Sequence, residues 1–441
     1  MNVHRSALSE EIGASRLGAG EVTAFLSENP NVQYVDCVFV DLCGNVRGKR
    51  IASAELENVF RSGIAVPSSI YFLDARGDVV DRLPEGAGGA GTAWPVAGSL
   101  TCVSWAQRPH GQVLMSLSDT EGAPYFGEPR NVLKRVLRRF EEFGVVPAIG
   151  VEIDAYLVER ERGKDGAPLA LTPANADVAK TICDGIVASA DVQKLPRILV
   201  AGSVPRMQFG VAMGGDALAA ADHAVFLRQI VRAVARKEKR DALFMARPLL
   251  GQPGCGLRVT VDLRRAGESV LSSGAGGDLV RFAVGGLQAL TAESLAIFAP
   301  GVNAFRRFGG QHALSRNRRW GYGNTTANVS IEARGGQIAI EHRLAAADAN
   351  PYLALAAVLA GLHYGIGQNI DPGQAADSDV SAFADPTFPV NIDAALLALE
   401  NGSVMREYLG PAYVDLYCTT KRAELERFRN VIPAHEYDWY A

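Results

Sequence analysis

The sequence lacks the features that mark secreted and membrane-spanning chains. Its N-terminal residues, MNVHRSALSEEIGASR, contain no apolar h-region. No stretch approaches the roughly 18 uninterrupted apolar residues of a transmembrane helix. The formal net charge is also small, at −4. It gives no reason to expect nucleic acid or an anionic membrane as a partner. We therefore expect a cytoplasmic protein that binds neither nucleic acid nor membrane.

The cysteines and histidines form no recognisable pattern. Six cysteines are scattered without a CxxC pair, so neither a zinc site nor a disulfide framework is indicated, which fits a reducing cytoplasm. Seven histidines are equally dispersed, with no HxH or HExxH spacing. Taken singly, each histidine is interpreted as a surface or packing residue rather than as a metal ligand.

What the sequence does contain is typical of a soluble globular protein. Hydrophobic residues make up 48% of the chain and charged residues 21%. A chain of 441 residues is longer than one core usually organises, so we expect two domains.

The first part of the chain has the pattern of a small β-rich domain. VQYVDCVFVDL, SSIYFLD and GQVLMSL are predicted strands, because β-branched and aromatic residues are frequent in them. GNVRGK is predicted as a turn, PEGAGGAGTAWP as a flexible loop, and SAELENVFRSG as a helix. The expected domain covers residues 19–118, after a loosely ordered lead-in over residues 1–18.

Helical patterns become frequent after residue 125. EPRNVLKRVLRRFEEFG has Pro129 at a helix start and Gly144 just past its end, with apolar residues on one helical face. Ala-rich helical patterns recur at 216–238, 281–297 and 350–365, and VVPAIGVEIDAYLVE and GLRVTVDL are predicted strands. We therefore predict an α+β second domain over residues 125–441.

Two carboxylates stand out within one predicted strand. Glu152 and Asp154 are two residues apart in VEIDAYLV, so both side chains project from the same face. Adjacent acids repel unless a cation lies between them, and Mg²⁺ or Mn²⁺ favours carboxylate oxygens. The alternative is a strand edge whose acids simply face solvent.

The same strand resembles the GxExExxL strand of glutamine synthetases, and further segments resemble that family in the same order along the chain. They are VDCVFVDLCGNVRGKRI, VPSSIYFLDARGDVV, FMARPLLGQPGCGLRVTVDL, PGVNAFRRF, WGYGNTTANV and IEHRLAAADANPYLALAAVLAGLHYGI. The resemblance covers roughly residues 30–440. CGNVRGKRI and EGAPYFGEPRNVLKR are most similar to the γ-glutamylputrescine synthetases within the family.

This resemblance implies a fold and an activity. The implied fold is α+β, with an N-terminal β-grasp domain and a catalytic-type domain built on a curved antiparallel half-barrel sheet with helices. The implied activity is ATP-dependent ligation of glutamate to ammonia or another amine, with Mg²⁺ or Mn²⁺ neutralising the transferring phosphoryl group. Family members are rings of subunits, typically two stacked hexamers, so a homo-oligomer such as a dodecamer is expected.

Several residues match the family's functional positions. By resemblance, three are metal ligands, two bind the substrate, and two are catalytic positions that contact phosphate, glutamate or the amine. They are Glu152, Asp154 and Glu341 as metal ligands, Gly254 and Arg343 as substrate-binding residues, and Arg307 with the β-grasp residue Asp41 as catalytic residues.

Other matched positions carry residues that cannot perform the family's roles. Gly202 stands where the first glutamate of ExxPGQxE belongs, and the second glutamate falls at Phe209 or Gly210, depending on a one-residue gap. Arg258 replaces the metal-binding histidine. On the nucleotide side, Thr260 replaces a histidine, and Thr325 and Ser330 replace phosphate-contacting arginines.

These replacements lead to a specific hypothesis for the site. Arginine has hydrogen-bond donors only, so Arg258 cannot ligate a cation, and we expect a buried ion-pair cluster of Arg258 with Glu152 and Glu341 in the metal's place. The preferred interpretation is a pseudoenzyme with a regulatory or assembly role, which could co-assemble with an active paralogue. The alternatives are a ligase with altered metal use or substrates, and a different, ATP-independent reaction in the cleft that members of the family form between neighbouring subunits.

Overall fold

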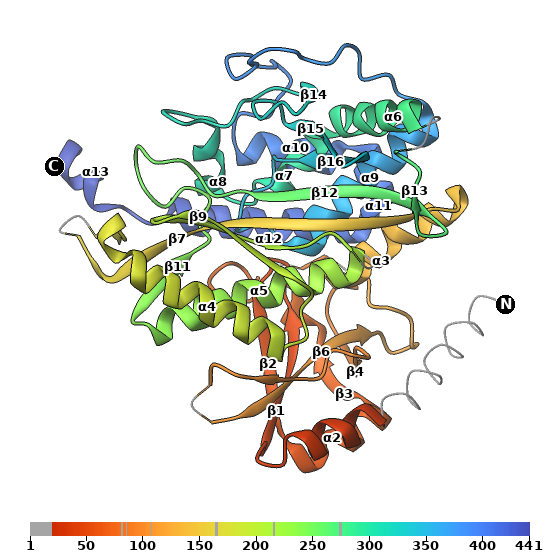
Figure 1. Ribbon diagram of the computed structural model, residues 1–441, viewed down its shortest axis with the longest axis vertical. Coiled ribbons are helices and arrows are strands. Elements are labelled where there is room, and N and C mark those ends of the chain that lie inside the picture. Colours follow the sequence, from red (N-terminus) through yellow and green to blue (C-terminus); the bar gives the residue numbers. More distant parts are fainter. Residues whose placement is uncertain are drawn as a thin grey trace.

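The computed structural model describes residues 20–441 except residues 81, 82, 85, 107, 164, 165, 215, 216 and 273–275. The lead-in predicted over residues 1–18 therefore lies outside the described residues. The described strands form two sheets, one of six strands and one of ten, and the change from the first to the second falls between Ser118 and Val146. In Figure 1 the smaller sheet lies below the larger one, with helices between them.

The smaller sheet has the strand order β2-β1-β6-β4-β3, with β5 paired to β6. Strands β1 and β6 are parallel, whereas β1 pairs with β2, and β4 with β6, in antiparallel fashion. The strands are β1 (Tyr34–Val40), β2 (Val46–Ala52), β3 (Ile64–Pro67), β4 (Ala90–Pro95), β5 (Thr101–Val103) and β6 (His110–Ser118), with helix α2 (Leu56–Ser62) after β2. Buried Val35, Cys37, Phe39 and Leu56 contribute to a core of their own beneath this sheet.

Three local predictions for this region were wrong in part. SSIYFLD begins as a 3-10 helix, Ser68–Tyr71, whose first residue is fixed by hydrogen bonds from its hydroxyl to the carbonyls of Ala87 and Gly89. Most of GNVRGK belongs to strand β2, which begins at Val46. The segment predicted as a flexible loop ends in strand β4, where a Cβ on Gly91 would lie 2.2 Å from the carbonyl oxygen of Ser118. Glycine is needed there for close approach of β6, so it does not indicate flexibility.

The larger sheet has the strand order β14-β15-β16-β12-β7-β10-β9, and β8 and β11 extend the pairing of the long strand β7. Most of its pairings are antiparallel, and the sheet curls into a half-barrel. Its strands are β7 (Val146–Arg162), β8 (Pro168–Ala170), β9 (Ile198–Ser203), β10 (Arg206–Val211), β11 (Arg240–Leu243), β12 (Leu257–Arg265), β13 (Glu268–Ser269), β14 (Trp320–Tyr322), β15 (Val329–Arg334) and β16 (Gln337–His342). The strands predicted from VVPAIGVEIDAYLVE and GLRVTVDL are confirmed as β7 and β12.

Helices surround this sheet. The described helices of this part are α3 (Pro129–Arg139), α4 (Ala176–Val192), α5 (Ala217–Lys237), α6 (Gly276–Ala289), α7 (Thr291–Phe298), α8 (Val302–Phe305), α9 (Pro351–Gln368), α10 (Ile392–Asn401), α11 (Ser403–Leu409), α12 (Pro411–Arg429) and α13 (Ala434–Tyr440). The four predicted helical segments are confirmed as α3, α5, α6 with α7, and α9. Helix α5 packs on β7, β10 and α9, and in Figure 1 α4 and α5 lie between the large sheet and the small one.

The α3 segment shows why the sequence was informative here. Pro129 is the first helical residue, and Gly144 ends the following 3-10 helix (Phe140–Phe143) with a left-handed φ of 59°. Proline is favoured at the first helical position and glycine after the last, as the sequence indicated. The predicted fold class, α+β with a curved half-barrel sheet and helices, is confirmed. Within the described residues, no helix combines the length and apolarity that crossing a bilayer requires.

Candidate active site

The predicted acids lie on a face shared by three neighbouring strands. Strand β7 carries Glu152 and Asp154, and the register places Arg258 of β12 opposite Glu152 on one side and Gly210 of β10 opposite it on the other. Directly paired residues on adjacent strands project from the same face of a sheet. The row Gly210, Glu152, Arg258 is therefore built into the register of the half-barrel.

The Arg258 guanidinium lies against both acids of strand β7. Its Nη1 is 3.7 Å from Oε2 of Glu152, and its Nη2 is 3.5 Å from Oδ1 of Asp154. The side chain of Asp154 is buried, at 4% exposure, whereas those of Glu152 and Arg258 are 34% and 30% exposed. The expected cluster of Arg258 with Glu152 and Glu341 is therefore present only in its pairing with Glu152; Asp154 takes the second place, and the cluster is half-buried rather than buried.

Asp154 is the most heavily bonded member of this cluster. Its Oδ2 accepts hydrogen bonds from Arg206 Nη2 at 2.7 Å and from the backbone N–H of Gly256 at 2.9 Å. Glu152 accepts a hydrogen bond from Gln208 Nε2 at 2.6 Å. Arg206 and Gln208 therefore hold the two acids from strand β10, and Arg258 contacts them from strand β12.

Glu341 does not take the place that was predicted for it. Its Oε1 accepts a hydrogen bond from Arg343 Nε, and the second guanidinium that we expected beside it, Arg258, pairs with Asp154 instead. The predicted pairing of Arg258 with Glu341 was therefore wrong. Arg343, two residues further along the chain, forms the ion pair with Glu341 in its place. Its Nη2 also lies 3.6 Å from Oε1 of Glu332.

A cavity of about 360 Å³ opens beside these residues. Arginines line it from four different segments of the chain, together with Asp154, Gly254 and Thr325; the arginines are Arg206, Arg258, Arg307 and Arg343. A cavity with this lining suits a ligand that carries carboxylate or phosphate oxygens, because guanidinium groups bind such oxygens in a bidentate manner.

Arg307 and Gly254 form the inner wall of the cavity. Arg307 is buried and donates from Nη1 to the carbonyl of Leu344 at 2.8 Å. Burial lowers its pKa, and the negative charge of Asp154 acts in the opposite direction. A Cβ on Gly254 would lie 2.8 Å from the Arg307 side chain, so glycine is required for this arginine to reach the cavity.

The nucleotide-side replacements occupy neighbouring positions. Thr260 lies opposite Glu341 across strands β12 and β16, and Ser330 lies opposite Glu341 from β15. Ser330 is fully buried and donates its hydroxyl to Glu332 at 2.8 Å. Thr325 lines the cavity itself. Each of these side chains is neutral at a position where the resemblance implies a ring nitrogen or a guanidinium.

The positions matched to the two glutamates of ExxPGQxE lie in different surroundings. Phe209 is fully buried in the core, while Gly210 lies on the cavity side, where a Cβ would be 3.1 Å from Cγ of Glu152. Of the two candidate positions, only Gly210 shares the face of Glu152, so a side chain there would lie beside the acids of β7. Gly202 pairs with Met207, out of phase with the cavity-facing positions, and has a φ of +89° that disfavours a side chain.

Asp41 lies apart from the other predicted residues. Its carboxylate is fully buried in the turn between β1 and β2, where it accepts hydrogen bonds from the Asn45 backbone N–H and from Arg47 Nε, each at 2.8 Å. Burial raises its pKa, although both hydrogen bonds act to lower it. Within the single chain Asp41 holds this turn, and a role toward an amine stays a prediction.

Sequence reasoning did not single out Arg206 or Gln208. The available signal was their spacing, because 206, 208 and 210 alternate with buried Met207 and Phe209 and so share one face of β10. Which arginine pairs with which acid depends on the register of β10 against β7, which the sequence does not specify.

The residues present do not fit the divalent metals that the resemblance implies. In the described part of the chain, no group of three or more His, Cys, Asp or Glu side chains is arranged to hold a metal ion. At the position expected for a metal, the two acids of β7 are already paired with guanidinium groups, which offer no lone pair to a cation.

Comparison with known proteins identifies the family of this fold. The model of the family described as glutamine synthetase, catalytic domain, matches residues 126–440. γ-Glutamylputrescine synthetase PuuA of Escherichia coli K12 is 31% identical over 443 residues, covering 95% of this chain and 94% of the relative. Glutamine synthetase of Pyrococcus horikoshii is 28% identical and covers 92% of each chain.

A solved structure described as a GmaS/ADP complex has the same fold, with a TM-score of 0.81 at 24% identity, over 95% of this chain and 99% of that one. The family match spans well over half of the chain and includes every strand of the half-barrel. The chain therefore belongs to the glutamine synthetase family, and its resemblance to the glutamate–amine ligases of that family is confirmed by the similarity to PuuA.

Proposed function

We propose that this protein is a glutamine synthetase relative that does not carry out metal- and ATP-dependent ligation, and that it serves a regulatory or assembly role. The observation that supports this most is the place of Arg258, whose guanidinium contacts Glu152 and Asp154 at 3.7 and 3.5 Å. A guanidinium there neutralises the acids without providing a site for a divalent cation.

The physical reason is the charge that phosphoryl transfer develops. Metal ions bridging the phosphates supply much of the stabilisation of that charge, and removing one well-placed cation costs orders of magnitude in rate. Here Gly210 lacks the oxygen ligand that the resemblance implies, and Arg258 and Arg206 occupy the acids that remain. The changes that remove metal ligands therefore involve three strands, β7, β10 and β12.

The cavity nonetheless remains suited to an anionic small molecule such as glutamate. Arg307, Arg343 and Gly254 line it, as the family's glutamate and phosphate positions would. We propose that the protein keeps this ligand cleft in a cytoplasmic homo-oligomer, a ring such as a dodecamer, which could include an active paralogue. ATP with Mg²⁺ or Mn²⁺ is the cofactor set implied by family membership, but the pairing of Glu152 and Asp154 with guanidinium groups does not favour binding of the metal.

An active ATP-dependent γ-glutamyl-amide ligase with altered metal use is the second candidate. Its support is the 31% identity to γ-glutamylputrescine synthetase PuuA over 95% of the chain, together with the retained Arg307 and Arg343. The two candidates differ in whether ATP is consumed.

The direct test is ADP release by the purified full-length protein with ATP, glutamate, Mg²⁺ or Mn²⁺, and either ammonia or putrescine. We expect no turnover above the buffer rate. Turnover that disappears in Glu341→Ala would show that the remaining acids hold a working metal, and the proposal would be wrong.

A restoration experiment tests the cause. The double variant Gly210→Glu with Arg258→His returns oxygen and nitrogen ligands beside Glu152, and Mn²⁺ binding measured by electron paramagnetic resonance should increase at least about tenfold. Arg264→His is the matched control, because it lies on the same strand with 32% side-chain exposure but pairs with Asp262 instead. Gly202→Glu is a poor choice, since φ is +89° at that position. Equal Mn²⁺ binding by the double variant and the control would contradict the proposed cause.

A further inference from the structure

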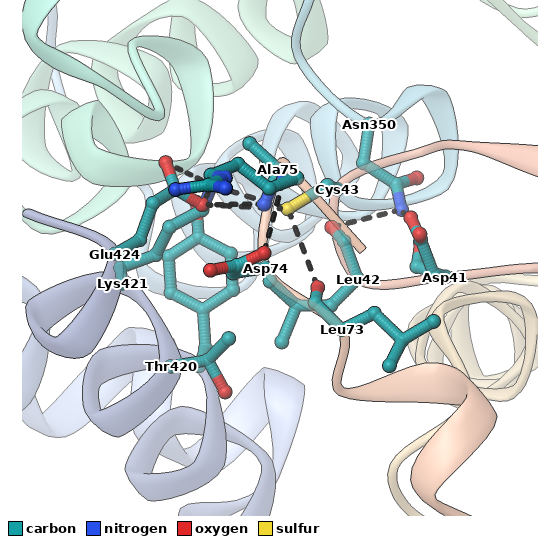
Figure 2. Close-up of polar contacts among 12 residues, drawn as sticks. Asp41, Leu42, Cys43, Leu73, Asp74, Ala75, Asn350, Thr420, Lys421 and Glu424 are labelled. Atoms are coloured by element: carbon teal, nitrogen blue, oxygen red, sulfur yellow. Dashed lines mark hydrogen bonds and ion pairs between the residues drawn. The ribbon is translucent and has the colours of Figure 1, made fainter. Parts of the chain in front are cut away.

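A second, smaller cavity lies between the smaller sheet and the helices that surround the larger sheet. It has a volume of about 170 Å³ and is lined by the turn between β1 and β2, by α5, by the start of α9 and by α12. The side-chain amide of Asn350 donates to the carbonyls of Asp41 at 2.9 Å and Leu42 at 3.2 Å, which ties the turn to the start of α9 (Figure 2). The cavity is therefore part of a fixed interface and lies apart from the candidate active site.

One wall of this cavity is already neutralised by its own contacts. Lys421 of α12 donates to Glu424 Oε2 at 3.1 Å and to Cys43 Sγ at 3.4 Å, and the same Glu424 oxygen accepts from the Ala75 backbone N–H at 3.1 Å. Figure 2 shows these groups turned toward one another between α12 and the loops of the smaller sheet. Burial raises the pKa of the Cys43 thiol to about 12, so it stays protonated. This wall has no charge left to offer a ligand.

The opposite wall differs, because it carries two guanidinium groups one helical turn apart on α5. Arg228 is 4% exposed and donates from Nη2 to the carbonyl of Ala349 at 2.5 Å, while its buried Nε has no hydrogen-bond partner. Arg232 lies over the ring of Phe244, 5.0 Å from its centroid. Neither guanidinium forms an ion pair with any part of the chain that the structure describes.

The electrostatics of this wall are unbalanced. Burial lowers the pKa of Arg228, and the adjacent Arg232 lowers it further, so the two charges are held together at a cost. Asp348 also lines this cavity, and its charge offsets both guanidinium groups; the same charge acts on Arg307 of the active site, and the Asp348 Oδ1 has no hydrogen-bond partner. Two guanidinium groups, Arg228 buried and Arg232 partly buried, therefore share the charge of this one acid in the cavity wall, and buried cations are normally paired.

We propose that this cavity binds a small oxyanion, namely the carboxylate or phosphate group of a metabolite, through Arg228 and Arg232. Both guanidinium groups line the cavity, and the buried side chain of Arg228 keeps an Nε without a hydrogen-bond partner. Gly44 in the opposing turn has a φ of +78°, and a Cβ there would lie 3.1 Å from Asn350, so the turn closes tightly over the cavity. An oxyanion bound here holds the smaller sheet's turn against α5.

The test is isothermal titration of the full-length protein with inorganic phosphate and, separately, with acetate, at constant ionic strength set by chloride. We expect saturable binding of at least one of the two, and the tighter of them identifies the oxyanion class. Arg232→Met should weaken that binding by about tenfold or more, because a charge-assisted contact is lost. Arg236→Met, on the same helix with a 66% exposed side chain, is the matched control and should bind as the wild type does.

Because the active-site cavity also contains arginines, hydrogen exchange is used to locate the bound anion. Phosphate or acetate should slow amide exchange in residues 41–45 of the wild type and of Arg258→Met, but not of Arg232→Met. Arg232→Lys keeps a cation and should retain protection, which distinguishes loss of charge from misfolding. Protection confined to the strands of the half-barrel, or binding unchanged by Arg232→Met, would overturn the proposal.

Discussion

A pH-dependent instability is expected at Glu128, which joins the smaller sheet to the start of α3. Its side chain is buried, and one oxygen, Oε2, accepts from the Leu117 backbone N–H at 2.7 Å, from Asn131 Nδ2 at 3.0 Å and from the Ser116 hydroxyl at 3.1 Å. Burial raises the pKa of this carboxyl from 4.5 to about 7. Glu128→Gln places a neutral amide of nearly the same shape in the site, and its oxygen can accept the same three bonds.

The sign follows from the raised pKa. Between pH 4.5 and about 7 the folded protein keeps the Glu128 proton and the unfolded chain releases it, so the free energy of unfolding falls as the pH rises. Since one pKa unit corresponds to about 1.4 kcal/mol, the full loss is about 3 kcal/mol once the pH exceeds 7. The uncharged glutamine is exempt from this loss, so Glu128→Gln should be more stable than the wild type at pH 8 by up to that amount.

The assay is urea denaturation of the wild type and Glu128→Gln at intervals from pH 4.5 to 8. The two curves should meet near the acid end and separate steadily toward pH 8. Glu141→Gln, an exposed neighbour in the 3-10 helix after α3, is the control and should follow the wild type. Wild-type and Glu128→Gln stabilities that run parallel across the whole range would refute the reasoning, because Glu128 would then titrate alike in both states.

Two further predictions use matched pairs. In thermal melts, Gly286→Ala should destabilise the protein by more than about 2 kcal/mol, because the added Cβ would lie 2.0 Å from the backbone of α9. Gly277→Ala on the same helix is the control; its Cβ meets nothing within 4 Å, so it should be neutral or slightly stabilising. Lys421→Met should cost about 3–5 kcal/mol in urea denaturation, since it leaves Glu424 beside a buried site without its cation, whereas Lys180→Met on the exposed face of α4 should leave the midpoint unchanged. Equal effects within either pair would contradict the packing or the charge argument respectively.

The sequence was most informative where one physical signal dominates. Pro129 and Gly144 mark the ends of one helical segment because each has a conformational reason to stand there. The spacing of Glu152 and Asp154 placed both acids on one face of β7, since a strand alternates strictly. Both results depend on neighbours along the chain, so they needed no knowledge of tertiary contacts.

The sequence was least informative where a contact from a distant segment decides the outcome. Gly91 resembled a loop residue, but it belongs to a strand that β6 approaches closely. Phe209 and Gly210 were indistinguishable as positions for the missing glutamate until the register of β10 against β7 was known. Arg206 was overlooked for the same reason, since its partner Asp154 lies 52 residues away in the chain.

The replacements in the half-barrel are coupled through charge. Removing metal ions while keeping Glu152 and Asp154 would leave two acids side by side, one of them buried at 4% exposure, with nothing to neutralise them. Arg258 and Arg206 supply that neutralisation from the two flanking strands, and Gly210 leaves out an acid that would add a further negative charge to the same row. Each change is therefore tolerable because the others accompany it. It follows that replacing Arg258 alone should unsettle the site, and that, under the proposed function, metal binding requires an acid and a neutral ligand to be introduced together.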